Sequence, residues 1–404
     1  MYIKRALESV IKEMSNTFPV VLVTGPRQVG KTTLLASIAE DNRQYVSLDD
    51  PIARQLANTD PLLFLQRYAP PVTIDEIQYA PALLPYIKLH VDRTKNNGDF
   101  WLTGSQMFQM MKGVSESLAG RVGIVPMQGL SISEINGCQN EPYTTDPKRL
   151  MARMSHVKKM NLHDIYTQIF KGAMPAVHTS AQSIERYYAS YVDTYLHRDL
   201  RDLSQVADEM QFQRFLTACA ARTSQMVNYA ELAKDVGITS PTAKRWLSLL
   251  VSSGIVVLIE PYFNNALKRI VKAPNMYFMD TGLCAYLTRW TSSETLEISA
   301  MSGAFFETFV VSEIIKSYLN AGKRPPVFYY RDFDQKEIDL MIEADGKLYP
   351  IEIKKSSHPK NNAGRHFSLL EKTGTSPGMG SIICMADDLI PVNQSAWAVP
   401  VWLI

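Results

Sequence analysis

The feature that most constrains this chain is the pattern GPRQVGKTT at residues 25–33, which follows four apolar residues at 20–23. A helical pattern of apolar residues begins directly afterwards, at Leu34. Between a buried strand and a helix, the glycines of such a loop permit turns that aim backbone N–H groups at phosphate oxygens, and the helix N-terminus adds its positive dipole. The pattern predicts a nucleotide-binding loop formed by Gly25, Pro26, Arg27, Gln28, Val29, Gly30, Lys31, Thr32 and Thr33.

Two side chains of this loop are expected to contribute chemistry. Lys31 would reach the β and γ phosphates, which makes it a catalytic as well as a binding residue. The Thr32 hydroxyl would complete the coordination of Mg2+. An ordinary glycine-rich connection is the alternative, but it would not require a buried strand before the loop and a helix after it.

A second short apolar strand ends in adjacent carboxylates, in the sequence PVTIDE at residues 71–76. A phosphate loop requires such an acidic partner. We expect Asp75 to hold Mg2+, mostly through water, and Glu76 to polarise the water that attacks the γ phosphate. A charged strand end without a catalytic role is the alternative.

A third buried strand, DFWLTGS at residues 99–105, ends in polar residues. Either Ser105 or Gln106 could orient the attacking water at its end. Further along, Arg121 is either a catalytic γ-phosphate sensor or a salt-bridged surface residue. A sensor that reaches a neighbouring subunit would require a homo-oligomer.

The alternation of strands and helices over residues 18–126 predicts an α/β fold, a parallel sheet with helices on both faces. The nucleotide should lie at the carboxyl ends of its strands. The chain has 404 residues and a formal net charge of +2, so we expect two or three domains and only local basic surfaces. No apolar run reaches the roughly 20 residues of a membrane helix, which predicts a cytoplasmic protein without membrane contact.

The segments GPRQVGKTT, TIDEIQ, LTGSQ and LAGR, the last followed by LSISE, together resemble prokaryotic AAA-type ATPases of the archaeal-ATPase branch, which carry a C-terminal domain of unknown function. The resemblance covers nearly the whole chain. It implies that the nucleotide is ATP, with Mg2+ as the accompanying ion. The chain agrees in lacking the base-specificity motif N-K-x-D after the third strand.

After this P-loop NTPase core, assigned to residues 1–136, we expect a helical linker or lid over 137–210 and a winged-helix module over 211–275. The second helix of that module would present Ser240, Thr242, Lys244 and Arg245 to DNA or RNA. Strands at 255–259 and 268–271 would form the wing. The alternative is a rigid docking unit that binds no nucleic acid.

The last segment, 276–404, is expected to form an α/β domain resembling the restriction-endonuclease-like fold. Asp339 lies in one strand, and Glu352 and Lys354 lie on one face of the next. Glu307, on the preceding helix, could add an acidic ligand. Carboxylates that bind Mg2+ and a lysine that activates water suit phosphodiester cleavage; a degenerate fold that only binds nucleic acid or protein is the alternative.

These features predict a Mg2+-dependent ATPase coupled to a winged-helix and nuclease-like module that acts on nucleic acid. The alternative is a nucleotide-switched binding protein, whose C-terminal fold recognises a partner without cutting it.

Overall fold

The computed structural model describes residues 2–105, 114, 116–196, 209–263, 273–332, 334–359 and 363–404. Two expected features therefore lie outside the described residues. They are Gln106 and the strand predicted at Lys268–Val271.

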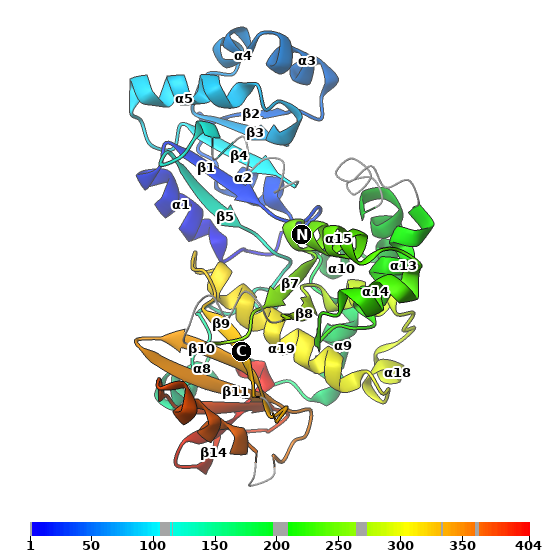
Figure 1. Ribbon diagram of the computed structural model, residues 1–404. Coiled ribbons are helices and arrows are strands. Elements are labelled where there is room, and N and C mark those ends of the chain that lie inside the picture. Colours follow the sequence, from blue (N-terminus) through cyan, green and yellow to red (C-terminus); the bar gives the residue numbers. More distant parts are fainter. Residues whose placement is uncertain are drawn as a thin grey trace.

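The N-terminal part contains a five-stranded parallel sheet in the order β2-β3-β4-β1-β5 (Figure 1). This confirms the predicted α/β fold. The strands are β1 Val20–Thr24, β2 Gln44–Ser47, β3 Val72–Asp75, β4 Phe100–Gly104 and β5 Val122–Pro126. The helices are α1 Leu7–Thr17, α2 Lys31–Ile38, α3 Pro51–Thr59, α4 Pro61–Arg67 and α5 Leu83–Thr94.

Strand β1 is buried on both faces, as the run of apolar residues predicts. Val21 and Val23 pack into the core that includes the apolar residues of α1 and α2. Val20 and Leu22 face the opposite core, which includes those of α3, α4 and α5. Because side chains alternate along a strand, this single segment holds helices on both faces of the sheet.

The sheet order places β4 between β1 and β3. Ser105, directly after β4, therefore lies between the phosphate loop, which follows β1, and the acidic pair at the end of β3. The consequence is that polar side chains from three strand ends meet at one edge of the sheet.

The middle of the chain is mainly helical. Its helices are α7 Ile132–Ile135, α8 Pro147–Met154, α9 Leu162–Lys171, α10 Pro175–Thr179, α11 Ile184–Tyr191, the π-helix η2 Val192–Leu196, α13 Glu209–Ala220, α14 Tyr229–Val236, α15 Ser240–Ser252, α17 Thr281–Leu287 and α18 Ser293–Glu297. The tyrosines of α11, Tyr187, Tyr188 and Tyr191, are buried.

Helices α14 and α15 form the helix, turn, helix arrangement that the sequence predicts. Gly237 ends α14 in the left-handed conformation, and the Thr239 side chain accepts a hydrogen bond from Thr242 N to cap α15. A small antiparallel sheet, β6-β8-β7, accompanies them, made of β6 Gln225–Met226, β7 Val256–Ile259 and β8 Asn275–Phe278. Thus β7 pairs with β8, further along the chain than the predicted partner.

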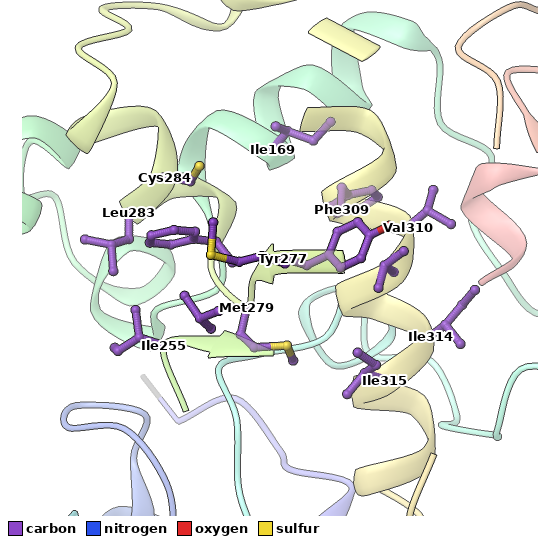
Figure 2. Packing of buried hydrophobic residues seen from close by; sticks show 14 of the residues in the cluster. Ile169, Ile255, Tyr277, Met279, Leu283, Cys284, Phe309, Val310, Ile314 and Ile315 are labelled. Carbon is purple, nitrogen blue, oxygen red and sulfur yellow. The ribbon is translucent and has the colours of Figure 1, made fainter. Parts of the chain in front are cut away.

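Helix α19, Ser302–Leu319, passes between the middle of the chain and the C-terminal sheet and is buried along most of its length. Figure 2 shows Phe309 and Val310 of this helix beside Tyr277 of β8, within a core that continues to Ile255 and Leu283. A helix that is apolar on nearly all sides must be covered on all of them, so α19 joins the middle of the chain to the C-terminal sheet.

Two charged residues of α19 reach the segment that follows β5. The Glu313 carboxylate accepts a hydrogen bond from Ile132 N at 3.0 Å, and Lys316 Nζ donates to Leu130 O at 3.0 Å. Lys316 and Glu313 also form an ion pair of 2.5 Å, and both side chains are buried. The charges are thus paired with each other and with the backbone, as buried charges must be.

The C-terminal sheet has the order β14-β15-β13-β11-β10-β9, with β12 paired to β11. Strands β9, β10 and β11 form an antiparallel meander, and strands near the end of the chain complete the same sheet. The bounds are β9 Val327–Arg331, β10 Glu337–Ala344, β11 Lys347–Ile353, β12 Ser376–Pro377, β13 Gly380–Cys384, β14 Ile390–Asn393 and β15 Ala396–Pro400. Within the described ranges, no helix is both long and apolar enough to cross a membrane.

Candidate nucleotide-binding site

The phosphate loop has a backbone that requires its glycines. Gly25 has a φ of 146°, and a Cβ at this position would lie 1.9 Å from Met127 O. Gly30 has a φ of 93°, and Gln28 adopts the left-handed region with a φ of 61°. These turns change the direction of successive peptide groups, which is what a phosphate-binding loop needs.

Lys31 lies in the interior of the loop. Its buried Nζ donates hydrogen bonds to Gly25 O at 3.0 Å and to Pro26 O at 2.8 Å. The Lys31 side chain therefore reaches back from the end of the loop to its first residues, where phosphate oxygens would become the acceptors of its ammonium group.

Thr32 and Asp75 meet across the site, as expected for a Mg2+ site. Thr32 Oγ1 donates to Asp75 Oδ1 at 2.9 Å, the Thr103 hydroxyl donates to the same oxygen, and Tyr45 OH donates to Asp75 Oδ2 at 3.2 Å. Carboxylate and hydroxyl oxygens are the ligands that Mg2+ prefers. The donor set at this edge of the sheet therefore fits the ion.

Glu76 is turned away from Asp75 by a left-handed backbone, with φ 57° and ψ 48°. Its N–H donates to Thr103 Oγ1 at 3.1 Å, and its carboxylate accepts hydrogen bonds from Gln78 and, at 3.4 Å, from Ser105. A non-glycine residue in this conformation is costly, and such strain gathers at functional sites. With this backbone conformation, the carboxylates of Asp75 and Glu76 point in different directions.

The structure places Ser105, one of the two candidates at the end of β4, beside Glu76. Gln106, the other, lies outside the described residues. Gln78 had no assigned role in the sequence, although it stands two residues after the catalytic candidate. Its position in the 3-10 turn Ile77–Tyr79 brings it back to the Glu76 carboxylate.

Of the two alternatives considered for Arg121, the structure has the salt-bridged surface residue. Arg121 immediately precedes β5, beside the start of β1, and Val20 N donates to Arg121 O at 3.2 Å. The site lies at the opposite, carboxyl ends of these parallel strands. The Arg121 side chain instead forms an exposed ion pair with Asp92, at 2.5 and 3.1 Å. Contact with a neighbouring subunit's nucleotide stays a prediction.

Residues from other elements hold the outer side of the loop. Tyr187 OH of α11 donates to Gln28 Oε1 at 2.8 Å, and Arg27 donates to Tyr79 OH at 3.3 Å. A Cβ on Gly254, just after α15, would lie 3.1 Å from Pro26 Cδ. The middle of the chain is thus in direct contact with the phosphate loop. The sequence could not show these contacts, because the partners are far apart along it.

A second cluster in the C-terminal sheet brings together the residues of the predicted nuclease site. Lys354 Nζ lies 2.8 Å from Glu352 Oε1 and 3.7 Å from Asp339 Oδ2, and Ile353 N donates to Asp339 Oδ2 at 2.7 Å. Glu307 of α19 accepts a hydrogen bond from Tyr277 OH at 2.8 Å. Tyr277 was not predicted to belong to this cluster, and nothing in the pattern of β8 indicates it.

Two carboxyl groups of this cluster, those of Asp339 and Glu307, have raised pKa values. Burial, followed by the charges of Glu352 and Glu307, raises the pKa of Asp339 well above its usual range. Burial also raises the pKa of Glu307 to about 7, partly offset by hydrogen bonds from Tyr277 and Ser224. A bound cation would stabilise the charged form of carboxyl groups that are crowded together away from water.

The cluster opens into a cavity of about 440 Å³, whose lining includes Glu352, Lys354, Arg365 and His366. Glu352 Oε2 is buried and accepts no hydrogen bond from any described residue. Among the described residues, however, no group of three or more histidine, cysteine, aspartate or glutamate side chains is arranged to hold a metal ion. The chemistry of the donors suits a cation, whereas their present arrangement does not form a complete site.

Comparison with known proteins divides the chain into three matched segments. Residues 17–136 match the family described as AAA domain. Residues 162–294 and 302–404 match two domains of unknown function, DUF8612 and DUF4143. The uncharacterized protein Rv2008c of Mycobacterium tuberculosis is 30% identical over 386 residues, which cover 95% of this chain and 80% of that protein.

The chain belongs to the Rv2008c family. The uncharacterized protein Mb2031c of Mycobacterium bovis matches with the same identity and coverage. In this member of the Rv2008c family, the AAA domain contains every described residue of the predicted ATP site. The match confirms the prediction of an AAA-type ATPase, while the two other matched segments carry no assigned activity.

Solved structures show weaker likenesses. The Walker-type ATPase PABY2304 of Pyrococcus abyssi has a TM-score of 0.43 and 15% identity, over 71% of this chain and 96% of that chain. A structure titled DNA replication initiation factor has a TM-score of 0.27 and 10% identity, over 60% and 85% of the two chains. Both scores are too low to support an argument about the function of the Rv2008c family.

Proposed function

We propose that this protein is a Mg2+-dependent ATPase that hydrolyses ATP and uses the cycle to control its C-terminal part. The observation that carries the proposal is the joint position of Thr32, Asp75 and Glu76. Thr32 and Asp75 are hydrogen-bonded to each other, while the backbone of Glu76 directs its carboxylate elsewhere. One carboxylate is thus available for the ion and the other for water.

Each residue then has a distinct role. Lys31 binds the phosphates, and Thr32 and Asp75 hold Mg2+, which supplies charge neutralisation at the β and γ phosphates. Glu76 accepts a proton from the attacking water as general base. Gln78 and Ser105 hold the Glu76 carboxylate in position through their hydrogen bonds.

The test is ATP binding and hydrolysis by two variants. Lys31→Ala should lose nucleotide binding, whereas Glu76→Gln should bind ATP with near wild-type affinity and lose hydrolysis, by about a hundredfold or more. Lys12→Ala and Glu13→Gln change exposed residues of α1 and serve as matched controls. Hydrolysis at the wild-type rate in both site variants would refute the assignment.

A second activity, cleavage of nucleic acid by the C-terminal domain, is favoured by a specific observation. The structure brings Asp339, Glu352 and Lys354 together beside a cavity. The residues predicted for a restriction-endonuclease-like site are thus neighbours in space, with Glu307 facing them from α19. DNA or RNA is the substrate class that this chemistry would act on, and Mg2+ is the ion.

The helices α14 and α15 with the sheet β6-β8-β7 support the proposal of a winged-helix module. Lys244 and Arg245 are exposed on α15, where they could contact phosphates. In this proposal the module delivers nucleic acid to the C-terminal cavity, or serves as a docking unit if it binds none.

Cleavage is tested with single- and double-stranded DNA and RNA, with Mg2+ or Mn2+, and with or without ATP. Loss of cleavage in Asp339→Ala and Lys354→Ala, but not in Lys347→Ala at the exposed start of β11, would support a nuclease. Binding that depends on ATP without cleavage would instead support the nucleotide-switched binding protein. The incomplete arrangement of metal ligands in the described residues is the observation that favours this second outcome.

A further inference from the structure

A buried arginine lies directly behind the phosphate loop. Arg5 Nη1 donates to Val29 O at 2.8 Å, Nη2 donates to Gln128 O at 2.7 Å, and Nε donates to Glu134 Oε1 at 2.9 Å. The side chain is 3% exposed. The guanidinium group thus joins the phosphate loop to the segment after β5 from the side of the N-terminal residues.

The hydrogen bond to Val29 O determines the direction of a peptide group in the loop. Val29 O and the Gly30 N–H belong to one peptide unit, and in a trans unit these two groups point in opposite directions. Because Arg5 holds the carbonyl from behind, the Gly30 N–H must face away from Arg5. The N–H groups of a phosphate loop act as phosphate donors from its inner side.

Gly30 would not keep this orientation by itself. Its φ of 93° is accessible because glycine lacks a Cβ, and the same freedom lets the peptide unit before it rotate. A donor that binds the carbonyl removes that freedom before the nucleotide arrives. The loop is then already ordered when the nucleotide binds, so the entropy of ordering it does not weaken nucleotide binding.

Arg5 is itself held in place. Glu134 Oε1 also accepts from Ala6 N at 2.9 Å, and Glu134 Oε2 accepts from Ser131 N at 2.9 Å as part of the capping box of α7. The charged pair is therefore fully hydrogen-bonded on the carboxylate side. Since a buried ion pair contributes little net stability compared with apolar residues of similar volume, its geometry is the property that matters here.

The geometry points to Arg5 as a positioning residue for the phosphates of the bound nucleotide, acting through the Val29–Gly30 peptide and oriented by Glu134. Arg5 does not contact the nucleotide and is not a catalytic residue. The inference rests on the proposed binding of ATP at this loop. Because the Gly30 N–H serves phosphates that ATP and ADP share, Arg5 should support the binding of both nucleotides equally.

The experiment compares Arg5→Lys with Arg43→Lys in the full chain. Arg43 is a matched control, because its side chain is also 3% exposed, donates to Glu40 Oε2 at 2.6 Å and to Gly98 O at 2.9 Å, and does not touch the loop. Lysine keeps the charge but cannot reproduce the planar fork of donors. The measurements are Kd values for fluorescent ATP and ADP analogues, KM and kcat for ATP, and Tm without nucleotide.

Arg5→Lys should raise both Kd values by the same factor, about tenfold, with KM rising more than kcat falls. Arg43→Lys should lower Tm but leave both Kd values within about twofold, as expected for a change remote from the site. Glu134→Gln, which keeps the volume and an acceptor, should give a smaller rise in both Kd values. If Arg5→Lys fails to fold, the two Kd values of Glu134→Gln test the positioning role instead.

Wild-type Kd values in both Arg5→Lys and Glu134→Gln, with only Tm reduced, would overturn the positioning role. A wild-type protein that binds nucleotide but does not hydrolyse it would overturn the proposed ATPase activity. The Kd values of the variants would still test the role of Arg5 in that case. A wild-type protein that binds neither nucleotide would overturn both.

Discussion

Thr103 donates its hydroxyl hydrogen to the Asp75 carboxylate and, through the same oxygen, accepts the N–H of the next residue, Glu76. One side chain of β4 thus fixes both the carboxylate expected to hold Mg2+ and the backbone turn that aims the expected general base. This double contact depends on the position of β4 between β1 and β3.

Replacement of Thr103 by valine should therefore impair hydrolysis more than binding. Thr103→Val keeps the shape but removes both hydrogen bonds, so kcat should fall about tenfold or more while the Kd for ADP stays within about twofold. Thr73→Val, at a buried position of β3 outside this contact, is the matched control. Equal kcat values for the two variants would contradict the role given to Thr103.

Charge reversal on α15 tests the proposed winged helix. If Lys244 and Arg245 contact phosphates, Lys244→Glu and Arg245→Glu should each weaken binding to all sequences alike, and the slope of log Kd against log salt should decrease by about one per lost contact. Lys234→Glu, on the exposed side of α14, is the control. Fluorescence anisotropy with labelled duplexes at several salt concentrations measures both quantities. An unchanged slope would favour the docking unit.

Arg121→Ala tests whether the exposed ion pair with Asp92 has any catalytic role. Exposed pairs contribute little, so we expect kcat to stay within about twofold of wild type. The protein's mass, measured with and without ATP under the assay conditions, shows whether a neighbouring subunit is present. Loss of activity in Arg121→Ala, together with an ATP-dependent oligomer, would instead show that Arg121 acts on the neighbour's nucleotide.

His178 of α10 should make the protein less stable in acid. Burial lowers the pKa of His178 below its ordinary value of 6.5, although its ring nitrogen bonds to Gly172 O at 2.9 Å. As the pH falls below about 6.5, the unfolded chain binds a proton that the folded chain resists, so the free energy of unfolding decreases. Between pH 7.5 and pH 5.5, wild type should therefore lose more Tm than His178→Gln. Parallel Tm curves would contradict this.

The phosphate loop, the acidic strand end and the parallel sheet could be predicted because their signals are local. The loop pattern in residues 25–33 and the apolar run before it lie within one short stretch. In the C-terminal sheet, the period of two along β11 was sufficient to place Glu352 and Lys354 on one face of the strand that follows the strand of Asp339. In each case, neighbouring residues in the chain determine the geometry.

What could not be predicted depends on contacts between distant segments. Arg5 and Glu134 are 129 residues apart, and no local pattern indicates that an arginine before α1 will reach the phosphate loop. Arg121 illustrates the same limit: its place before β5 puts it at the amino edge of the parallel sheet, but its ion pair joins it to Asp92, 29 residues away in the sequence. Tyr277 joined the acidic cluster only because β8 packs against α19.

Glu313 and Lys316 have a practical consequence for anyone who wishes to study the AAA domain by itself. A polypeptide ending at residue 136 would keep Leu130 and Ile132 but lose the α19 charges that satisfy their backbone groups. It would also lose the later apolar residues that belong to the same core as Val21 and Val23. Such a fragment should be poorly soluble. The AAA domain should therefore be studied in the full chain rather than as an isolated domain.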